Sequence, residues 1–178
     1  GVHVKHRLMK YHDFFVERIR PGERVLDIGC GVGAVAYSVA TKAGATVTGV
    51  DLNAESIASA QRMFRHPHLV FLHGDALKDF PSGSFDTVIL SNVLEHIQHR
   101  IEFLERMQRA LAPRRLLIRV PMFNRDWRVP MRQELGLCYF SDPTHYIEYT
   151  KETFEHEMRQ ARLKILHFQI QWGEIWAE

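Results

Sequence analysis

The feature that most constrains the fold of this 178-residue chain is a glycine-rich turn between an apolar run and a helical pattern. The run occupies residues 25–28, the glycines are Gly29, Gly31 and Gly33, and the helical pattern begins at Ala34. Glycines at alternate positions allow a tight turn and let a ligand approach the backbone at the helix N-terminus. The same letters fit the dinucleotide fingerprint G-x-G-x-x-A, so other features must choose the ligand.

Apolar, β-branched runs alternate with helical patterns along most of the chain. Such alternation is typical of a doubly wound α/β sheet whose strands are covered on both faces. We expect strands over residues 24–28, 46–50, 69–72, 85–91, 116–120, 165–170 and from 175 onward. We expect helices over residues 4–20, 34–42, 54–64 and 97–111, and a further helix that Thr150 caps.

Length and composition predict a single domain over residues 1–178. The chain is 46% hydrophobic and 25% charged, as globular proteins are, and no linker or internal repeat interrupts it.

Residues 121–149 contain three prolines and six aromatic residues without clear periodicity. This stretch is predicted to be an irregular insertion over the carboxyl edge of the sheet, where it would form a substrate lid.

Charge and cysteine content narrow the expected partners and location. The net charge of +2 demands neither nucleic acid nor an anionic membrane as a partner, although residues 100–132 hold nine basic and three acidic residues. No apolar run approaches the roughly 18 residues of a membrane helix, and the first residues lack the layout of a signal peptide. Cys30 and Cys138 are too few for a disulfide scaffold, which suits a cytoplasmic protein.

Three aspartates follow or end successive predicted strands. Asp27 stands two residues before the first glycine, where it would repel a pyrophosphate and attract a cationic amino group or a sulfonium. Asp51 closes the next strand, about 20 residues after the glycine turn, where a carboxylate can accept both hydroxyls of a ribose. Asp75 follows the third strand and can accept a hydrogen bond from an adenine amine. We therefore expect three acids at one crevice.

The segments VLDIGCGVG, GVDLN, HGDAL and FDTVILSNVLEHI, in this order, resemble the class I S-adenosylmethionine-dependent methyltransferases of the small-molecule type, and the resemblance covers nearly the whole chain. It implies S-adenosylmethionine as cofactor, S-adenosylhomocysteine as product, and a Rossmann-like, mostly parallel seven-stranded sheet whose last strand is antiparallel. It also implies a set of cofactor-binding residues. These are Asp27, Gly29, Gly31 and Gly33 for the methionine moiety, Asp51 and Leu52 for the ribose and adenine faces, Asp75 and Ala76 for the adenine edge, and Ser91 and Asn92 near the amino group.

The chain departs from the family pattern at two places. Pro113 is followed by two arginines where related enzymes commonly have Pro-Gly-Gly, so this turn must avoid positive φ or strain a residue other than glycine. Residues 91–94 read Ser-Asn-Val-Leu and lack the Asn-Pro-Pro-Tyr signature associated with methylation of exocyclic amines in nucleic acid and glutamine. Nucleic acid is therefore not the expected substrate.

His96 and His145 are the candidate catalytic bases. A base is needed only if the methyl acceptor is a hydroxyl, because an in-line displacement mainly requires alignment and exclusion of water. His96 follows the fourth predicted strand, and His145 lies in the predicted insertion within Asp-Pro-Thr-His-Tyr. In the alternative interpretation, these histidines only hold loops in place or contact the cofactor. Asp142, His145 and Glu148 offer possible metal ligands, but no metal is predicted.

Arginines and aromatic residues are interleaved in the insertion and predict a substrate site of Arg125, Trp127, Arg128 and Tyr149. Guanidinium groups beside aromatic rings suit a sugar or an anionic group such as phosphate, whereas the alternative is a packed cap with surface arginines. The predicted function is methyl transfer to a hydroxyl of a small polar acceptor, and the candidate acceptors are saccharide-linked or phosphorylated compounds. The alternatives are an RNA or protein methyltransferase and a non-catalytic S-adenosylmethionine-binding protein. The expected partner is a small-molecule substrate, and no membrane partner is expected.

Overall fold

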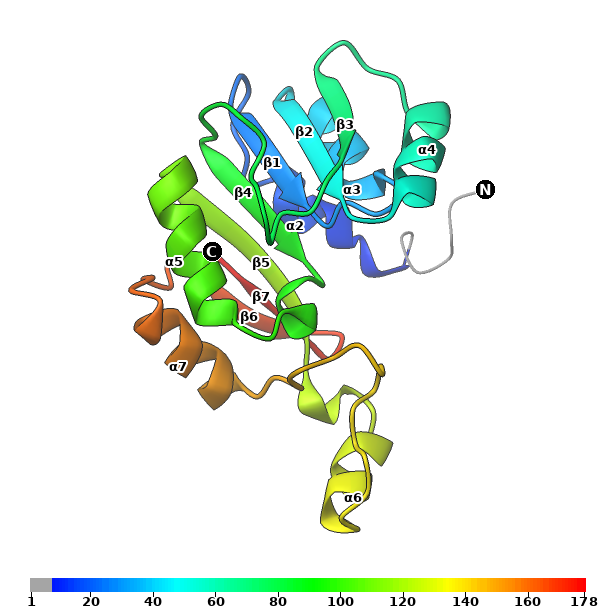
Figure 1. Ribbon diagram of the computed structural model, residues 1–178, viewed down its shortest axis with the longest axis vertical. Coiled ribbons are helices and arrows are strands. Elements are labelled where there is room, and N and C mark those ends of the chain that lie inside the picture. The colour runs from blue at the N-terminus through cyan, green and yellow to red at the C-terminus, as the bar shows by residue number, and fades with distance from the viewer. Residues whose placement is uncertain (1–7) are drawn as a thin grey trace. The chain divides into compact units, whose positions relative to one another are not determined.

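The computed structural model describes residues 8–178 and is drawn in Figure 1. Helices and strands alternate in the first part of this range, and an antiparallel pair of strands ends it. The elements are α2 (Tyr11–Val16), β1 (Arg24–Ile28), α3 (Ala34–Ser38), the π-helix η1 (Val39–Ala43), β2 (Thr46–Asp51), α4 (Ala54–Met63), β3 (Leu69–His73), β4 (Thr87–Ser91), the 3-10 turn η2 (Leu94–His96), α5 (Arg100–Leu111), β5 (Arg115–Pro121), the 3-10 turn η3 (Phe123–Arg125), α6 (Arg128–Glu134), α7 (Lys151–Gln160), β6 (Phe168–Gln171) and β7 (Glu174–Ala177).

Seven strands among the described residues form one sheet in the order β3-β2-β1-β4-β5-β7-β6. β2 pairs in parallel with β1 and β3, so that Asp27 lies opposite Gly49 and Asp51 lies opposite His73. β7 runs antiparallel to both β5 and β6. The predicted Rossmann-like, doubly wound and mostly parallel sheet with an antiparallel last strand is therefore confirmed.

The chain divides into two compact units. The first unit contains the residues up to Ile89 together with Ala110–Leu117, and the second contains Leu90–Arg109 and Ile118–Glu178. Fully buried side chains of β1 and β2 form the core of the first unit, in which α4 packs against β2 and β3. Large aromatic residues, among them Phe154 and Trp176, are buried in the second. The interpretation of the whole chain as one domain with a substrate lid stays a prediction.

Gly33 shapes the start of α3 in the first unit. Its φ is 81°, in the left-handed region that favours glycine, and it stands at the N-cap of the helix. A Cβ atom built on Gly33 would lie 2.4 Å from Cζ of Phe71 in β3. The missing side chain thus lets the glycine turn pack closely against the third strand.

Side-chain caps fix two helix starts that the sequence predicts. Asn53 accepts a hydrogen bond from the backbone of Ser56 at 2.9 Å and begins α4. Thr150 and Thr153 form a reciprocal capping box that begins α7. These local bonds explain why both helix starts could be read from the sequence.

Five described residues other than glycine have left-handed backbone, and two of them, Ala112 and Trp172, lie in turns that lead into strands. Ala112, with φ of 43°, takes the left-handed conformation in the turn where related enzymes have glycine, while Arg114 and Arg115 avoid it. Trp172 and Gly173 have φ of 57° and 68° and connect β6 to β7. Two consecutive left-handed residues match the right-handed twist of an antiparallel hairpin.

Several element boundaries differ from the sequence-based expectation. The first helix was expected over residues 4–20, but α2 covers only part of that range, and residues 4–7 lie outside the described residues. α5 begins at Arg100, because Ile97 is buried in the preceding loop and not on the helix. The stretch over 121–149, expected to be irregular, contains η3 and α6, whereas residues 135–148 include no helix or strand. α6 buries only Val129, so its sequence lacks the apolar periodicity that identifies a packed helix.

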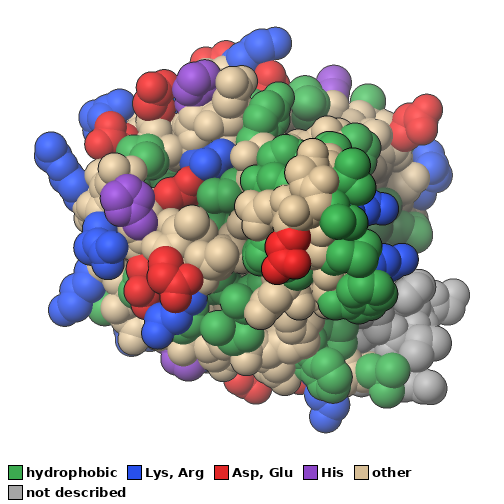
Figure 2. Space-filling view, turned by 90° about the horizontal axis from the view of Figure 1, so that it is seen from below, with side chains coloured by type: hydrophobic (Ala, Val, Ile, Leu, Met, Phe, Trp, Pro, Cys, Tyr) green, Lys and Arg blue, Asp and Glu red, His purple; other side chains and the backbone are tan. Residues whose placement is uncertain are grey.

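α5 and α7 lie side by side in the second unit (Figure 1). Nε2 of Gln108 donates a hydrogen bond to the carbonyl oxygen of Ala161 at 2.9 Å, and the guanidinium of Arg100 pairs with Glu157 at 2.7 Å. The face in Figure 2 shows hydrophobic side chains gathered mainly to the right of centre, with acidic, basic and histidine side chains mostly toward the left and the edges. Across residues 8–178, every helix is too short or too polar to cross a membrane.

Candidate active site

Asp27 is the most buried acid of the first unit's candidate site. It lies in the buried part of β1, one residue before the end of the strand, and is 2% exposed. Burial, with a smaller contribution from the charge of Asp51, raises the pKa of Asp27 to about 7. Its Oδ2 atom has no hydrogen-bond partner among the described residues. A buried carboxylate without a hydrogen-bond partner attracts a cationic group strongly, because an unpaired buried charge is costly.

Asp51 is held by the glycine turn. Its Oδ2 accepts a hydrogen bond from the backbone N–H of Gly31 at 2.7 Å, and its Oδ1 accepts one from Asn53 at 2.8 Å. Gly31 has φ of 53°, and a Cβ atom there would meet nothing within 4 Å. Each carboxylate oxygen of Asp51 keeps a second lone pair, so the side chain is both oriented and able to accept further hydrogen bonds.

The other glycines differ in what they do. The backbone N–H of Gly29 donates to the carbonyl oxygen of Val50 at 2.8 Å, which joins the turn after β1 to β2. Gly29 has φ of 68°, so the turn uses the left-handed region at this position too. Gly33 has the packing role against Phe71 described above. All the predicted glycines therefore shape one turn, with Gly31 facing open space and Gly33 facing a strand.

Asp75 lies two residues after the end of β3. Its Oδ1 accepts a hydrogen bond from the backbone of Leu77 at 3.0 Å, and its Oδ2 lies 3.5 Å from Nζ of Lys78. Ala76 follows it in the same turn and is half-buried. Leu52 is the residue directly after β2 and is 67% exposed. Its carbonyl oxygen lies 3.0 Å from Nε2 of His73. The predicted acids thus lie at or near the carboxyl ends of three parallel strands, Asp27 and Asp51 within β1 and β2 and Asp75 two residues beyond β3.

Ser91 and Asn92 belong to the second unit. Asn92 has φ of 58°, and its backbone N–H donates to the carbonyl oxygen of Arg119 at 2.8 Å. Its side-chain Oδ1 is buried without a hydrogen-bond partner among the described residues. Oγ of Ser91 lies 3.5 Å from Nη1 of Arg119. Asn92 therefore offers an unused acceptor at the end of β4.

The two candidate bases lie together in the second unit. The rings of His96 and His145 have centroids 4.7 Å apart in a T-shaped arrangement. Nδ1 of His145 lies 3.0 Å from Oε1 of Glu148, and Nδ1 of His96 lies 2.8 Å from Oγ1 of Thr144. Burial, followed by the neighbouring His145, lowers the pKa of His96. A lowered pKa favours the neutral imidazole, the form that accepts a proton.

Two acids accompany this histidine pair. Glu95 is fully buried, and neither of its carboxylate oxygens has a hydrogen-bond partner among residues 8–178. Burial raises the pKa of Glu95 to about 8. Glu148 is also buried, and it accepts a hydrogen bond from Oγ of Ser141 at 2.7 Å. In the sequence, the only sign of a role for Glu95 is its position beside His96. Nothing in the sequence points to Ser141.

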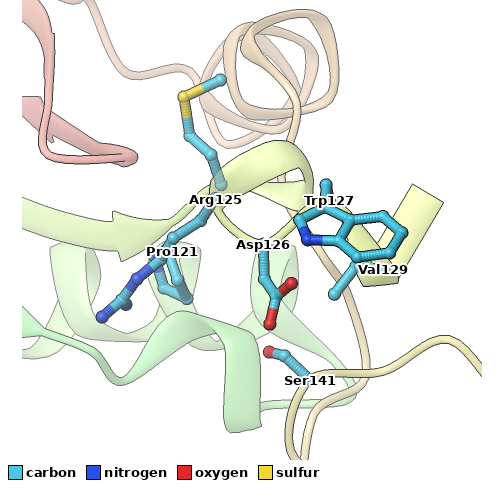
Figure 3. Close-up of a pocket in the computed structure, with 7 residues that line it drawn as sticks. Pro121, Arg125, Asp126, Trp127, Val129 and Ser141 are labelled. Carbon is cyan, nitrogen blue, oxygen red and sulfur yellow. The ribbon is translucent and has the colours of Figure 1, made fainter. Parts of the chain in front are cut away.

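A cavity of about 410 Å³ opens in the second unit. Its size is that of small-ligand sites, which span roughly 300–1,000 Å³. Figure 3 shows Asp126 and Ser141 pointing toward one another across it, with Trp127 and Val129 on one side and Pro121 and Arg125 on the other. Trp127 is 70% exposed. The structure therefore brings predicted substrate residues Arg125 and Trp127 to one cavity.

The predicted substrate arginines both have acidic partners. Nη1 of Arg125 lies 3.1 Å from Oε1 of Glu174, which is fully buried and also pairs with Arg119 at 2.8 Å. Nε of Arg128 donates to Oδ1 of Asp126 at 2.9 Å, and this hydrogen bond lowers the pKa of Asp126 to about 2. Their positive charges are thus partly neutralised within the protein.

Tyr149 has the environment of a core residue. It is fully buried, and its hydroxyl donates a hydrogen bond to Oε2 of Glu157 at 2.7 Å. Its ring packs edge-on against Phe154, with centroids 5.8 Å apart. The structure does not bring Tyr149 to the lining of the cavity described above, and its assignment to substrate binding stays a prediction.

Comparison with known proteins gives a consistent result. A family model described as a methyltransferase domain matches residues 2–167. The chain is 31% identical over 110 residues to norajmaline N-methyltransferase of Rauvolfia serpentina, a match that covers 59% of this chain and 38% of that protein. It is 36% identical over 112 residues to fatty-acid O-methyltransferase of Mycolicibacterium smegmatis, covering 61% and 40%. The chain thus spans about two fifths of the length of these relatives.

A solved structure supports the fold. Magnesium protoporphyrin IX methyltransferase of Synechocystis PCC 6803, crystallised with bound S-adenosylhomocysteine, superposes with a TM-score of 0.73 at 20% sequence identity. The superposition covers 98% of this chain and 82% of that protein. Sheet, helices and their order along the chain are therefore shared.

Proposed function

Because the chain belongs to the class I S-adenosylmethionine-dependent methyltransferase family, we propose that it transfers a methyl group to a hydroxyl of a small polar acceptor. The observation that carries the proposal is the carboxylate of Asp27, which is 2% exposed and has an oxygen without a hydrogen-bond partner among the described residues. A cationic ligand would satisfy this oxygen, whereas a pyrophosphate would be repelled by it. The negative charge of Asp27 therefore favours a sulfonium cofactor over a dinucleotide.

The residues of the first unit fit such a cofactor. When bound, S-adenosylmethionine supplies a methyl group attached to a positively charged sulfur. Asp27 and the turn of Gly29, Gly31 and Gly33 would hold its methionine moiety, and Asp51 would accept the ribose hydroxyls with its remaining lone pairs. Exposed Leu52 would cover the adenine, while Asp75 and Ala76 would bind its edge. For Ser91 and Asn92, contact with the amino group stays a prediction; Oδ1 of Asn92 is buried and lacks a donor within the described chain.

The cavity of the second unit supports a small acceptor. It offers polar side chains in Asp126 and Ser141 and an exposed indole in Trp127. An aromatic face beside hydrogen-bonding groups suits the apolar face and the hydroxyls of a sugar-like ring. We therefore favour a saccharide-type acceptor over a phosphorylated one. Arg125 and Arg128, which would be needed for a phosphate, each already share their charge with an acid.

The histidine pair supports oxygen as the acceptor atom. A hydroxyl must lose its proton during transfer, and a neutral imidazole with a fixed orientation is suited to take it. The bond from Nδ1 of His145 to Glu148 orients that ring and leaves its Nε2 available. His96 is oriented in the same way through Thr144. A neutral amine acceptor would need no such pair, although relatives of both kinds exist.

Thermal unfolding with ligands tests the cofactor assignment. S-adenosylhomocysteine should raise the Tm of the protein and NAD should not, because the former brings a cationic amino group to Asp27 and the latter an anionic pyrophosphate. Asp51→Ala should abolish the shift. Asp79→Ala, which removes an exposed acid four residues from Asp75, is the matched control and should preserve it. A shift with NAD alone would overturn the proposal.

Methyl transfer is tested separately with S-adenosylmethionine that carries an isotopically labelled methyl group. The protein is incubated with panels of sugars, sugar phosphates and amines, and labelled products are detected by mass spectrometry. We expect label on a sugar-type hydroxyl, and His145→Gln should lower the rate at least about 100-fold. Label on amines only would overturn the choice of oxygen. Binding without transfer to any compound would favour the non-catalytic alternative.

A further inference from the structure

Glu95, His96 and His145 form a cluster, here called the Glu–His–His cluster, that the proposed function uses only in part. One ligand atom from each residue lies within 4.8 Å of those of the other two. The residues come from η2 and from the loop before α7, 49 positions apart in the chain. The backbone N–H of Tyr146 donates to the carbonyl oxygen of Glu95 at 2.8 Å, and this bond ties the two segments together.

The hydrogen bonds of the cluster determine which imidazole nitrogens are available. Oγ1 of Thr144 donates to Oδ1 of Asp142 at 2.6 Å, so the same hydroxyl must accept the proton of Nδ1 of His96. Nδ1 of His145 donates to the carboxylate of Glu148 at 3.0 Å. Both rings are thereby held as the tautomer whose Nε2 carries a lone pair. A carboxylate behind a histidine is the usual way in which proteins orient a metal-binding imidazole.

Glu95 supplies an independent reason for a cation. It is 0% exposed, and neither oxygen has a donor among the described residues. From these contacts we propose that Glu95, His96 and His145 bind a divalent first-row transition-metal ion.

The donor set selects the class of ion. Two imidazoles and one carboxylate suit Mn²⁺, Fe²⁺, Co²⁺ or Zn²⁺, whereas Mg²⁺ and Ca²⁺ prefer oxygen ligands throughout. Asp142, whose charge also acts on His96, adds a further negative charge beside the cluster. Three protein ligands leave open coordination positions for an exogenous oxygen.

The site has a consequence for the acceptor, which rests on the proposed function. Ser141 donates to Glu148 behind His145 and also lines the cavity of the second unit. An acceptor in that cavity would have an ordered path of polar groups to the cluster. An ion held by the cluster would lower the pKa of a bound acceptor hydroxyl, whose proton would then leave to solvent water. His96 and His145 would serve as ligands in place of the base role proposed above, because one Nε2 lone pair cannot bind a metal and accept a proton together.

Metal binding can be measured without turnover. Protein stripped with EDTA and dialysed is titrated with Mn²⁺, Co²⁺ or Zn²⁺ by calorimetry, and bound metal is counted by elemental analysis. We expect one ion per chain, with Mg²⁺ unable to compete. Glu95→Gln and His145→Ala should weaken binding by more than the 10- to 100-fold that Glu148→Gln, behind the ligand, is expected to cause.

Two controls separate this site from surface binding and from misfolding. His66 and His68 form another ring pair, with centroids 5.8 Å apart, and His68→Ala should leave the titration unchanged. Metal-free Glu95→Gln should unfold at the same urea concentration as wild type or a higher one, because a neutral amide replaces a buried carboxylate. Equal metal affinity in wild type, Glu95→Gln and His145→Ala would overturn the proposal, as would a stoichiometry lowered by His68→Ala alone.

The measurements that would contradict the metal site differ from those that would contradict the proposed function. The Tm shift with S-adenosylhomocysteine is assigned to Asp27 and Asp51, and it should persist in Glu95→Gln. Loss of labelled product after chelation and its return with Mn²⁺ would support the link between metal and acceptor. Undiminished transfer by the chelated protein would overturn that link.

Discussion

The two units of this protein build their candidate sites by different means. In the first unit, Asp27 and Asp51 stand at the ends of parallel strands, and the partners of Asp51 are backbone N–H groups of a glycine turn. In the second unit, the candidate residues lie on loops and short helices, and charged side chains pair with one another. A site on strand ends is positioned by the sheet, whereas a site on loops needs side-chain networks to hold it. The predictions below test this contrast.

The largest effect is expected at the buried acid of the second unit. Glu174→Gln leaves Arg119, which is 5% exposed, and Arg125 without their shared carboxylate. Removing one partner of a buried ion pair costs about 3–5 kcal/mol, so we expect the free energy of unfolding to fall by about 5 kcal/mol in urea denaturation. Arg128→Gln breaks an exposed pair and should cause no measurable change. Similar losses from both variants would show that burial does not govern these pairs.

The second effect concerns Asp27 and depends on pH. Its folded-state pKa is raised to about 7, so its contribution to stability is complete below pH 4 and is lost as the pH rises through 7. Measured without cofactor, the stability of Asp27→Asn relative to wild type should rise by about 4 kcal/mol between pH 4 and pH 8. Urea denaturation at both pH values measures this, with Asp79→Asn as a control that should stay level. A constant difference would mean that Asp27 is well solvated or paired.

The third effect tests the packing of the glycine turn. Gly33→Ala places a methyl group 2.4 Å from the ring of Phe71 in a left-handed conformation, and we expect a loss of about 3 kcal/mol. Gly136→Ala in the second unit has the same backbone strain, with φ of 66°, but open space around it. It should cost only about 1 kcal/mol. Both losses in the free energy of unfolding are measured by urea denaturation. Equal losses in the two variants would show that contact with Phe71 does not explain the glycine at position 33.

The smallest effect on stability is expected at the cavity. Trp127 is 70% exposed, so Trp127→Ala should change the free energy of unfolding by less than about 0.5 kcal/mol. The KM for the acceptor should nevertheless rise about tenfold, since the indole lines the cavity. Leu135→Ala, at another exposed apolar residue of the same segment, should alter neither quantity. An unchanged KM for Trp127→Ala would move the acceptor away from this cavity.

Elements with local signals could be predicted in both units, as the start of α7 at Thr150 shows. Strands over 24–28 and 46–51 could be predicted closely because apolar β-branched runs end at glycine and aspartate. α6 could not be predicted, since it buries a single side chain and has no apolar period. Tyr149 shows the same limit, because aromatic residues in a loop carry no sign of whether they face the core or a ligand. Its burial depends on Glu157 and Phe154, which come later in the chain.

The sequence by itself determined the sheet and the acids that follow its strands, because strand and helix periodicities are local and parallel strands bring their carboxyl ends to one edge. Only the tertiary structure decided the partners of those residues that lie on loops. It placed Glu95 and His96 close to His145, and it paired Arg125 with Glu174 in an ion pair. Such pairings depend on burial and on distances between remote segments, and no local pattern encodes either quantity.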